Sequence, residues 1–177
     1  NIGRVNIYTI DADRFISEVD GKWDVVIIDF PDPHTIEVAK LYSKEFYLKL
    51  HNVLSDGAIV AIQSTSPFFA KESFLTIKRT LEAAGYGVIP YHENVPSFGE
   101  WGWILAWGGM DYSSNEIVQK ISGLDELGVD TKYLTPDLMR QALVFPKGWL
   151  KSQNSDISTL MRPRVQYYYM HEDWKLR

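Results

Sequence analysis

Apolar runs and segments of helical periodicity alternate along the chain up to about residue 110. The runs that predict strands are rich in apolar and β-branched residues and cover Val5–Ile10, Trp23–Ile28, Ala58–Ile62, Tyr86–Tyr91 and Trp101–Trp107. Apolar residues three or four positions apart predict helices over Asp13–Val19, Ile36–Leu54 and Ser73–Ala84. The alternation predicts an α/β fold with a mainly parallel sheet. The run WDVVII is apolar on both faces, which is typical of the middle of a sheet that helices cover.

The pattern changes after Gly109. The rest of the chain contains no clear buried strand. A start signal at Thr135-Pro136-Asp137 predicts one helix, and a second is predicted over Tyr167–Lys175. We therefore expect two parts, a sheet domain followed by a helical tail that packs on it, with the boundaries 1–110 and 111–177.

Composition removes several classes of function. The chain has no cysteine, which excludes a thiol nucleophile, a disulfide and a cysteine-bound metal or cluster. Its four histidines show no metal-ligand spacing, so we predict no metal site. The net charge of -5 offers no basic surface to nucleic acid and suits a cationic small molecule. No apolar run approaches the roughly 20 residues of a membrane span, and we expect a cytoplasmic protein.

The glycine-rich turn of nucleotide-binding sheets is missing from the sequence. A nucleotide-type ligand usually meets such a turn after the first strand of a doubly wound sheet, yet neither G-x-G-x-x-G nor G-x-x-x-x-G-K occurs here. The chain also begins directly before a predicted strand. Either the fold takes no nucleotide-type ligand, or the chain is the back part of such a fold. We favour the second interpretation, a sheet without its first strands.

Two carboxylates follow the most buried of the predicted strands. Asp29 and Asp32 lie in the sequence D-F-P-D-P, in which the two prolines restrict φ and stiffen the loop. A rigid pair of carboxylates can bind an ammonium group, and one of them can take a proton from an amine. Asp before Pro is also an ordinary turn starter, so the residues alone leave a purely structural role open.

Polar residues also follow two other predicted strands. Asp11 and Ala12 end the first strand, where a carboxylate can accept a hydrogen bond from an exocyclic amine such as that of adenine, and a small neighbour lets a ring lie flat. The structural alternative for Asp11 is a helix N-cap. Gln63 ends the third strand and is either a ligand contact or a clamp for the loop.

Aromatic residues are concentrated in two further segments. The stretch Asn94–Trp103, which includes Phe98 and Glu100, predicts either a lid over an alkyl chain, with Glu100 as a further acid, or ordinary packing. The run Tyr167–Tyr169 near the end is more typical of an interface than of chemistry.

Four segments together resemble the spermidine synthase family, the polyamine aminopropyltransferases. The family's strand, Asp-x-x-Asp-Pro loop and helix read here DVVIIDFPDPHTIEVAKLYSKEFY, and its glutamine lies in AIQSTSPF. The lid segment reads NVPSFGEWGW, and the tail segment reads TKYLTPDLMRQALVFP. The segments occur in the family's order between Asp11 and Pro146. The resemblance implies a partial Rossmann-like fold of the class I methyltransferase type, with flanking helices.

The resemblance also implies a role for each candidate residue. Asp29 is expected to deprotonate the attacking amine. The residues expected to bind the amine substrate are Asp32, Gln63, Phe98 and Glu100. The residues expected to meet the adenine ring are Asp11 and Ala12. The implied reaction moves an aminopropyl group from the co-substrate decarboxylated S-adenosylmethionine to putrescine, and neither a metal nor a prosthetic group is implied.

Several positions depart from the family pattern. Phe30-Pro31 replaces a Ser- or Thr-containing dipeptide, His34-Thr35 replaces Gly-Pro, Phe98 replaces the lid tyrosine and Met139 replaces a tail histidine. With these residues the sequence resembles a branch of the family whose longer members carry membrane segments ahead of the synthase domain. Because the family's first strands and glycine-rich turn are missing, we expect a longer gene product and no turnover by this chain alone. We also expect a homodimer that is cytoplasmic or membrane-tethered. The alternatives are a methyltransferase-like protein that uses S-adenosylmethionine and a non-catalytic polyamine-binding module.

Overall fold

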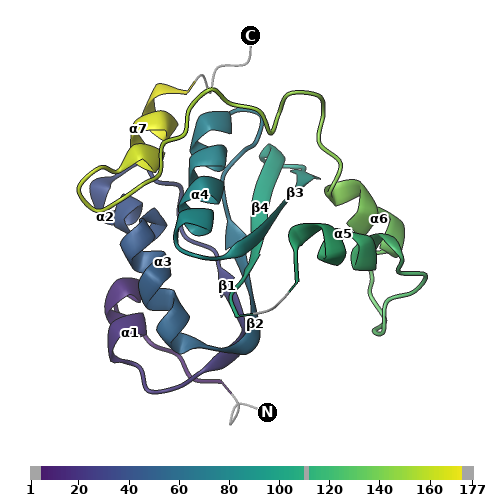
Figure 1. Cartoon of the computed structure of the whole chain (residues 1–177), viewed down its shortest axis with the longest axis horizontal. Coiled ribbons are helices and arrows are strands. Elements are labelled where there is room, and N and C mark those ends of the chain that lie inside the picture. Colours follow the sequence, from purple (N-terminus) through teal and green to yellow (C-terminus); the bar gives the residue numbers. More distant parts are fainter. Residues whose placement is uncertain (1–4, 110–111, 173–177) are drawn as a thin grey trace.

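The computed structural model describes residues 5–109 and 112–172 (Figure 1). The strands within them are β1 (Trp23–Ile28), β2 (Leu54–Gln63), β3 (Gly87–Val95) and β4 (Gly99–Trp107). The α-helices are α1 (Ala12–Glu18), α2 (Ile36–Ala39), α3 (Lys44–Leu50), α4 (Lys71–Ala83), α5 (Ser114–Ser122), α6 (Pro136–Ala142) and α7 (Arg164–His171). Short 3-10 helices follow α2 and α3 directly, at Lys40–Tyr42 and His51–Val53.

The strands form one mixed sheet in the order β1-β2-β4-β3. The partial Rossmann-like sheet with flanking helices is confirmed, but its parallel part is limited to β1 and β2, because β4 is antiparallel to both of its neighbours. A turn at residues 96–98 joins β3 to β4 and is too short for the crossover that parallel strands require. Gly99 completes this turn with a φ of 75°, a conformation that favours glycine.

Two predictions about the first strands are wrong. β1 lies at an edge of the sheet in the described part of the chain, not in the middle, and Val25 and Ile27 on its outer face are 64% and 76% exposed. Val5–Ile10 forms no strand, since none of its residues has strand hydrogen bonding. Apolar, β-branched sequence favours a strand only where a neighbouring strand accepts and donates its backbone hydrogen bonds. No described segment offers this segment such a partner.

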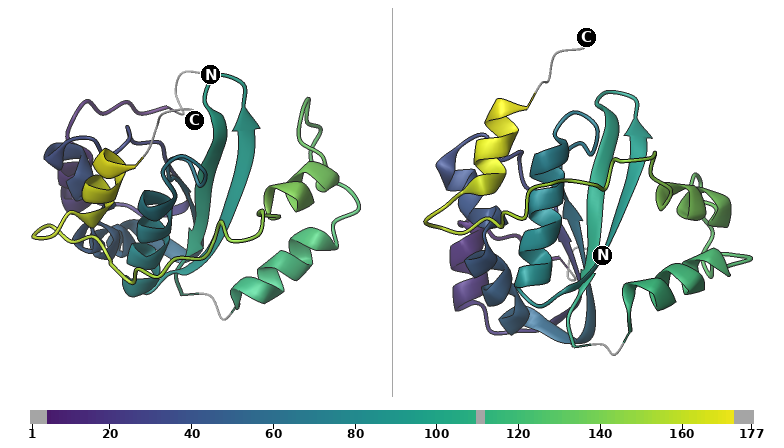
Figure 2. Two further views of the ribbon diagram at one scale, coloured as in Figure 1. Left: turned by 90° about the horizontal axis from the view of Figure 1, so that it is seen from above. Right: turned by 45° about the horizontal axis from the view of Figure 1, so that its top comes forward.

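Helices cover both faces of the sheet (Figures 1 and 2). On one face α4 contacts β3 and β4, α3 packs beside α4, α1 lies against α3, and α7 lies against α4. On the other face α5 and α6 contact β3. The segment between α6 and α7 passes over α4, where the Arg79 side chain donates to the carbonyl of Asp156. Among the described residues, the structure contains no helix of the length and hydrophobicity that crossing a bilayer requires.

Most of the predicted helices are confirmed. Those predicted over Asp13–Val19 and Ser73–Ala84 appear as α1 and α4. α6 begins as predicted, with Thr135 as its N-cap and Pro136 in its first turn. α7 begins before the helix predicted over Tyr167–Lys175, and Lys175 lies outside the described residues.

Local capping explains where the helix prediction fails. The single helix predicted over Ile36–Leu54 is interrupted at Ser43, whose backbone is extended and whose hydroxyl accepts a hydrogen bond from the N–H of Phe46. A serine in this conformation starts a new helix. The sequence analysis also missed α5, although Ser113 and Glu116 form a capping box at its start.

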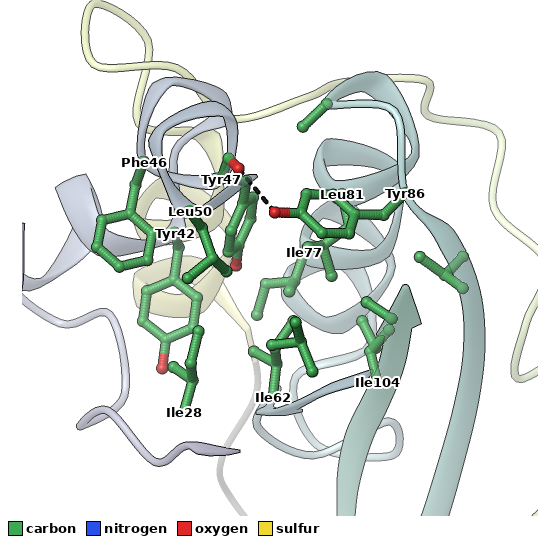
Figure 3. Close-up of a cluster of buried hydrophobic side chains, with 14 of the residues drawn as sticks. Ile28, Tyr42, Phe46, Tyr47, Leu50, Ile62, Ile77, Leu81, Tyr86 and Ile104 are labelled. Carbon is green, nitrogen blue, oxygen red and sulfur yellow. Dashed lines mark hydrogen bonds between the residues drawn. The ribbon is translucent and has the colours of Figure 1, made fainter. Parts of the chain in front are cut away.

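The main hydrophobic core lies between the sheet and helices α3 and α4 (Figure 3). Aromatic side chains of the α2–α3 region pack against aliphatic side chains of the strands and of α4, and the labelled members are Ile28, Tyr42, Phe46, Tyr47, Leu50, Ile62, Ile77, Leu81, Tyr86 and Ile104. The Tyr86 hydroxyl donates to the carbonyl of Tyr47 at 2.9 Å, which links the residue just before β3 to α3. This packing holds the carboxyl ends of β1 and β2 in a fixed place beside α2.

Candidate active site

A cleft of about 750 Å³ lies at the carboxyl ends of β1 and β2. Residues that follow parallel strands meet at the same edge of a sheet, and here that edge carries Asp29, Asp32 and Gln63, all of which line the cleft. The cleft's aromatic residues on β4, β3 and the turn between them are Tyr91, Phe98, Trp101 and Trp103. Two carboxylates beside an aromatic wall suit an alkyl chain that carries positive charge.

The loop from Asp29 to Pro33 places the two acids differently. Asp29 directly follows β1 and is exposed. Its side chain makes no hydrogen bond and no ion pair with any residue that the structure describes. Asp32 is half-buried, and its carbonyl accepts a hydrogen bond from the N–H of His34 at 2.7 Å. Pro33 is buried and fixes the backbone just before α2. The loop thus presents two carboxylates to the same cleft, one without a partner among the described residues and one that is anchored.

Both oxygens of Asp32 accept hydrogen bonds from side chains. Oδ1 accepts from the amide nitrogen of Gln63 at 2.9 Å, and Oδ2 accepts from the hydroxyl of Tyr169 at 2.8 Å. The amide oxygen of Gln63 in turn accepts from the hydroxyl of Tyr42 at 3.1 Å. These bonds join β2, α7 and the 3-10 helix at Lys40–Tyr42 around one carboxylate. A carboxylate held at both oxygens has one orientation toward the cleft.

The two tyrosines of this network are hydrogen-bond donors at neutral pH. Burial raises the pKa of Tyr42 well above its usual range. Burial and the hydrogen bond to Asp32 both raise the pKa of Tyr169. Because each hydroxyl keeps its proton, the network stays intact as the pH rises through the neutral range.

The aromatic stretch predicted as a lid is the tip of the β3–β4 hairpin. The strands extend further than predicted, to Val95 and from Gly99, so that only residues 96–98 form the turn. Phe98 lines the cleft, is 60% exposed and contacts Trp101 at a ring-centroid distance of 5.3 Å. The apolar wall is therefore a strand surface with one exposed ring at its end.

Glu100 does not line this cleft. Its carboxylate contacts Nδ1 of His92 at 2.8 Å, and Nε2 of the same ring contacts the carbonyl of Val144 at 2.9 Å. The role predicted for Glu100, a further acid in the substrate site, stays a prediction. The position of Glu100 ties the hairpin to the segment after α6.

Neither Asp11 nor Ala12 lines this cleft. Asp11 is the N-cap of α1, and its carboxylate also pairs with Lys40 at 2.8 Å. The hydrogen bond from Lys40 and those from the backbone lower the pKa of Asp11. Ala12 lines a second cavity of about 520 Å³. Ile27, Ile28 and Phe30 line both this cavity and the cleft, so the two spaces adjoin.

Two residues of the site were missed by sequence analysis. In the sequence Tyr42 is one apolar position of a helical pattern, and its hydroxyl carries no local signal. Tyr169 belongs to a tyrosine run that is more typical of an interface, and its partner Asp32 is 137 positions away. Only the packing of α7 beside the acidic loop brings them together.

Comparison with known proteins shows the family to which this chain belongs. A family model described as the spermine/spermidine synthase domain matches residues 1–118. This chain belongs to the spermine/spermidine synthase family. Relatives within the family include polyamine aminopropyltransferase 1 of Streptomyces coelicolor, 37% identical over 97% of this chain, and a polyamine aminopropyltransferase of Shewanella oneidensis, 34% identical over 98%. The matched regions are 31% and 30% of those two proteins, so the chain spans about a third of their length.

Solved structures show that the fold is that of spermidine synthases. A spermidine synthase in complex with the transition-state analogue AdoDATO matches 83% of this chain and 51% of its own with a TM-score of 0.67 at 18% identity. The spermidine synthase of Thermotoga maritima matches with a TM-score of 0.62 at 17% identity. At these identities the likeness establishes the shared fold alone, and residue roles are argued from the geometry of the site.

Proposed function

We propose that the protein containing this chain is a polyamine aminopropyltransferase that moves the aminopropyl group of decarboxylated S-adenosylmethionine to putrescine. The observation that carries this proposal is the single cleft lined by Asp29, Asp32 and an aromatic wall. Family membership and the names of the relatives support the same reaction.

The chemistry requires a base for the acceptor. An alkyl diamine has a pKa of roughly 10, like that of lysine, so its nitrogen carries a proton at neutral pH and cannot attack. Asp29 lines the cleft, is exposed and has no partner among the described residues. We therefore assign to Asp29 the role of the base that accepts the proton of the attacking amine. The freed nitrogen lone pair forms a C–N bond to the aminopropyl carbon next to sulfur. The C–S bond breaks, its electron pair goes to sulfur, and methylthioadenosine leaves as a neutral thioether.

Asp32 is assigned to bind the second ammonium group of the diamine, the one that does not attack. Its carboxylate is held in place by Gln63 and Tyr169 and is therefore suited to positioning a cation rather than to moving a proton. The methylene chain between the two nitrogens would lie along the aromatic wall, beside Tyr91 and Trp103, which stack at 5.7 Å.

The donor is assigned to the Ala12 side of the site. The second cavity adjoins the cleft at Ile27, Ile28 and Phe30, and the family resemblance assigns adenine recognition to Asp11 and Ala12. One structural neighbour is a spermidine synthase in complex with AdoDATO, which supports decarboxylated S-adenosylmethionine as the co-substrate.

The test uses the complete gene product with decarboxylated S-adenosylmethionine and putrescine, and follows spermidine and methylthioadenosine by mass spectrometry. Asp29→Asn is expected to lower kcat by about 100-fold or more, the usual effect of losing a general base. Asp24→Asn is the matched control, because Asp24 lies on β1, the strand that Asp29 follows, contacts Ser55 and is absent from the cleft lining. Turnover by Asp29→Asn at the wild-type rate would remove Asp29 from the mechanism. Methyl transfer from S-adenosylmethionine itself, without aminopropyl transfer, would overturn the proposed reaction.

A further inference from the structure

Helix α7, near the far end of the chain, contacts the acidic loop through two side chains. The Tyr169 hydroxyl donates to Oδ2 of Asp32 at 2.8 Å, and the Gln166 amide donates to the carbonyl of His34 at 3.4 Å. These two residues are three positions apart, so they lie on the same face of the helix. One face of α7 is therefore directed at the loop that carries both candidate acids.

Separate contacts hold α7 in this position. The Ser73 hydroxyl donates to the carbonyl of Val165 at 2.9 Å, and the N–H of Ser73 donates to the carboxylate of Glu172 at 2.9 Å. Val165 is fully buried. Because α4 fixes α7 at both of its ends, the Tyr169 hydroxyl reaches Asp32 from a rigid support.

The neighbouring tyrosine has a different partner. The Tyr168 hydroxyl donates to the carboxylate of Asp156 at 2.6 Å, and neither residue lines the cleft. Two adjacent tyrosines thus make the same kind of bond, one to a cleft carboxylate and one to a carboxylate in the segment between α6 and α7. This pair separates the effect of a tyrosine hydroxyl on the site from its effect on the docking of α7.

We propose that Tyr169 is a positioning residue for the amine acceptor and acts through Asp32. This inference rests on the proposed function. The Tyr169 hydroxyl fixes Oδ2, while Gln63 fixes Oδ1, so the carboxylate faces the cleft with its remaining lone pairs. Without the hydroxyl, the carboxylate can rotate about a single remaining anchor. The site then holds the second ammonium group less firmly, whereas Asp29 and the donor side are unaffected.

The first experiment compares Tyr169→Phe with Tyr168→Phe in the complete gene product. Tyr169→Phe is expected to raise KM for putrescine about ten-fold, as for the loss of one hydrogen bond to a charged group, with kcat and the KM of the donor nearly unchanged. Tyr168→Phe is expected to leave all three constants at wild-type values. Equal KM for putrescine in wild type and Tyr169→Phe would overturn the inference while leaving the proposed function standing.

A double-mutant cycle tests whether Tyr169 acts through Asp32. Asp32→Asn is expected to raise KM for putrescine. The double variant with Tyr169→Phe is expected to have the same KM as Asp32→Asn alone. Full additivity of the two effects would contradict the positioning role. Calorimetric titration with putrescine gives the same comparison without turnover. A wild-type protein that binds putrescine but transfers nothing would overturn the proposed function alone, and one that neither binds nor transfers would overturn both.

Discussion

Gly102 lies where β4 packs tightly against the buried ring of Phe74. A Cβ atom added there would lie 2.6 Å from Cε2 of Phe74 and 3.0 Å from Cδ of Pro67. The Gly102 backbone also bonds to Ser64 and Thr65, just after Gln63. A side chain at this position therefore has to displace either a buried ring or the strand that leads into the cleft.

We expect Gly102→Ala to lower the free energy of unfolding by about 1–3 kcal/mol, the usual cost of overpacking a core. Gly128→Ala is the control, because an added Cβ there has no neighbour within 4 Å, and it should stay within about 0.5 kcal/mol of the parent. Urea denaturation followed by circular dichroism measures both. Equal midpoints for the two variants would show that Phe74 moves aside without cost.

At the scale of single residues, the sequence predicted the acids better than their partners. Asp29, Asp32 and Gln63 all follow apolar strand runs, and parallel pairing brings such positions together. Tyr42 and Tyr169 could not be found in this way, because their hydroxyls matter only through contacts set by the packing of distant segments. The roles assigned to Asp11 and Glu100 remain predictions, and both carboxylates are engaged by other side chains.

At the scale of elements, the start of helix α4 is capped by a residue at the end of α7. The N-cap residue of α4, Ala70, has no capping side chain, and the carboxylate of Glu172 accepts from the N–H of Ser73 instead. Burial raises the pKa of Glu172 to about 7, with Glu72 as a further cause, although the backbone N–H groups of α4 oppose the shift. The C-terminal end of α7 therefore carries an acid that titrates near neutral pH.

This pKa predicts a pH dependence of stability. The folded state holds the Glu172 proton up to about pH 7, whereas an unfolded glutamate loses it near pH 4.5. The stabilising contribution is therefore complete below the unfolded value and is lost as the pH rises through about 7. Glu172→Gln keeps an acceptor oxygen and has no such loss. We expect wild-type Tm to fall relative to this variant between pH 5 and pH 8, as measured by scanning calorimetry; parallel Tm profiles would contradict the assignment.

Helices and strands could be predicted where the apolar pattern or the capping residues lie within the element itself. β1 has the predicted bounds, α4 begins and ends close to the bounds predicted for it, and α6 begins at its predicted start signal. The failures have physical causes. Ser43 interrupts an otherwise regular apolar pattern because its hydroxyl competes for a backbone N–H. Val5–Ile10 has strand-like composition, but a strand also requires a partner.

On the scale of the whole molecule, the outer side of β1 is the most exposed apolar surface of the sheet. β1 pairs only with β2 among the described residues, and Val25 and Ile27 are 64% and 76% exposed beside that unpaired edge. The sequence predicted a buried strand here, since WDVVII is apolar on both faces. The composition of β1 suits a strand that is buried on both faces. In the described part of the chain, one side of β1 is uncovered.

An uncovered apolar edge strand is a site of association between chains. We expect the 177-residue chain by itself to associate in a concentration-dependent way. Val25→Lys should shift it toward the monomer, because a lysine beside the edge opposes pairing with a second copy. Val129→Lys is the matched control, since Val129 is 70% exposed but lies outside the sheet. Sedimentation velocity over a range of concentrations measures all three chains. If the wild-type chain stays monomeric throughout, or if both lysine variants act alike, the edge of β1 is not the surface that drives association.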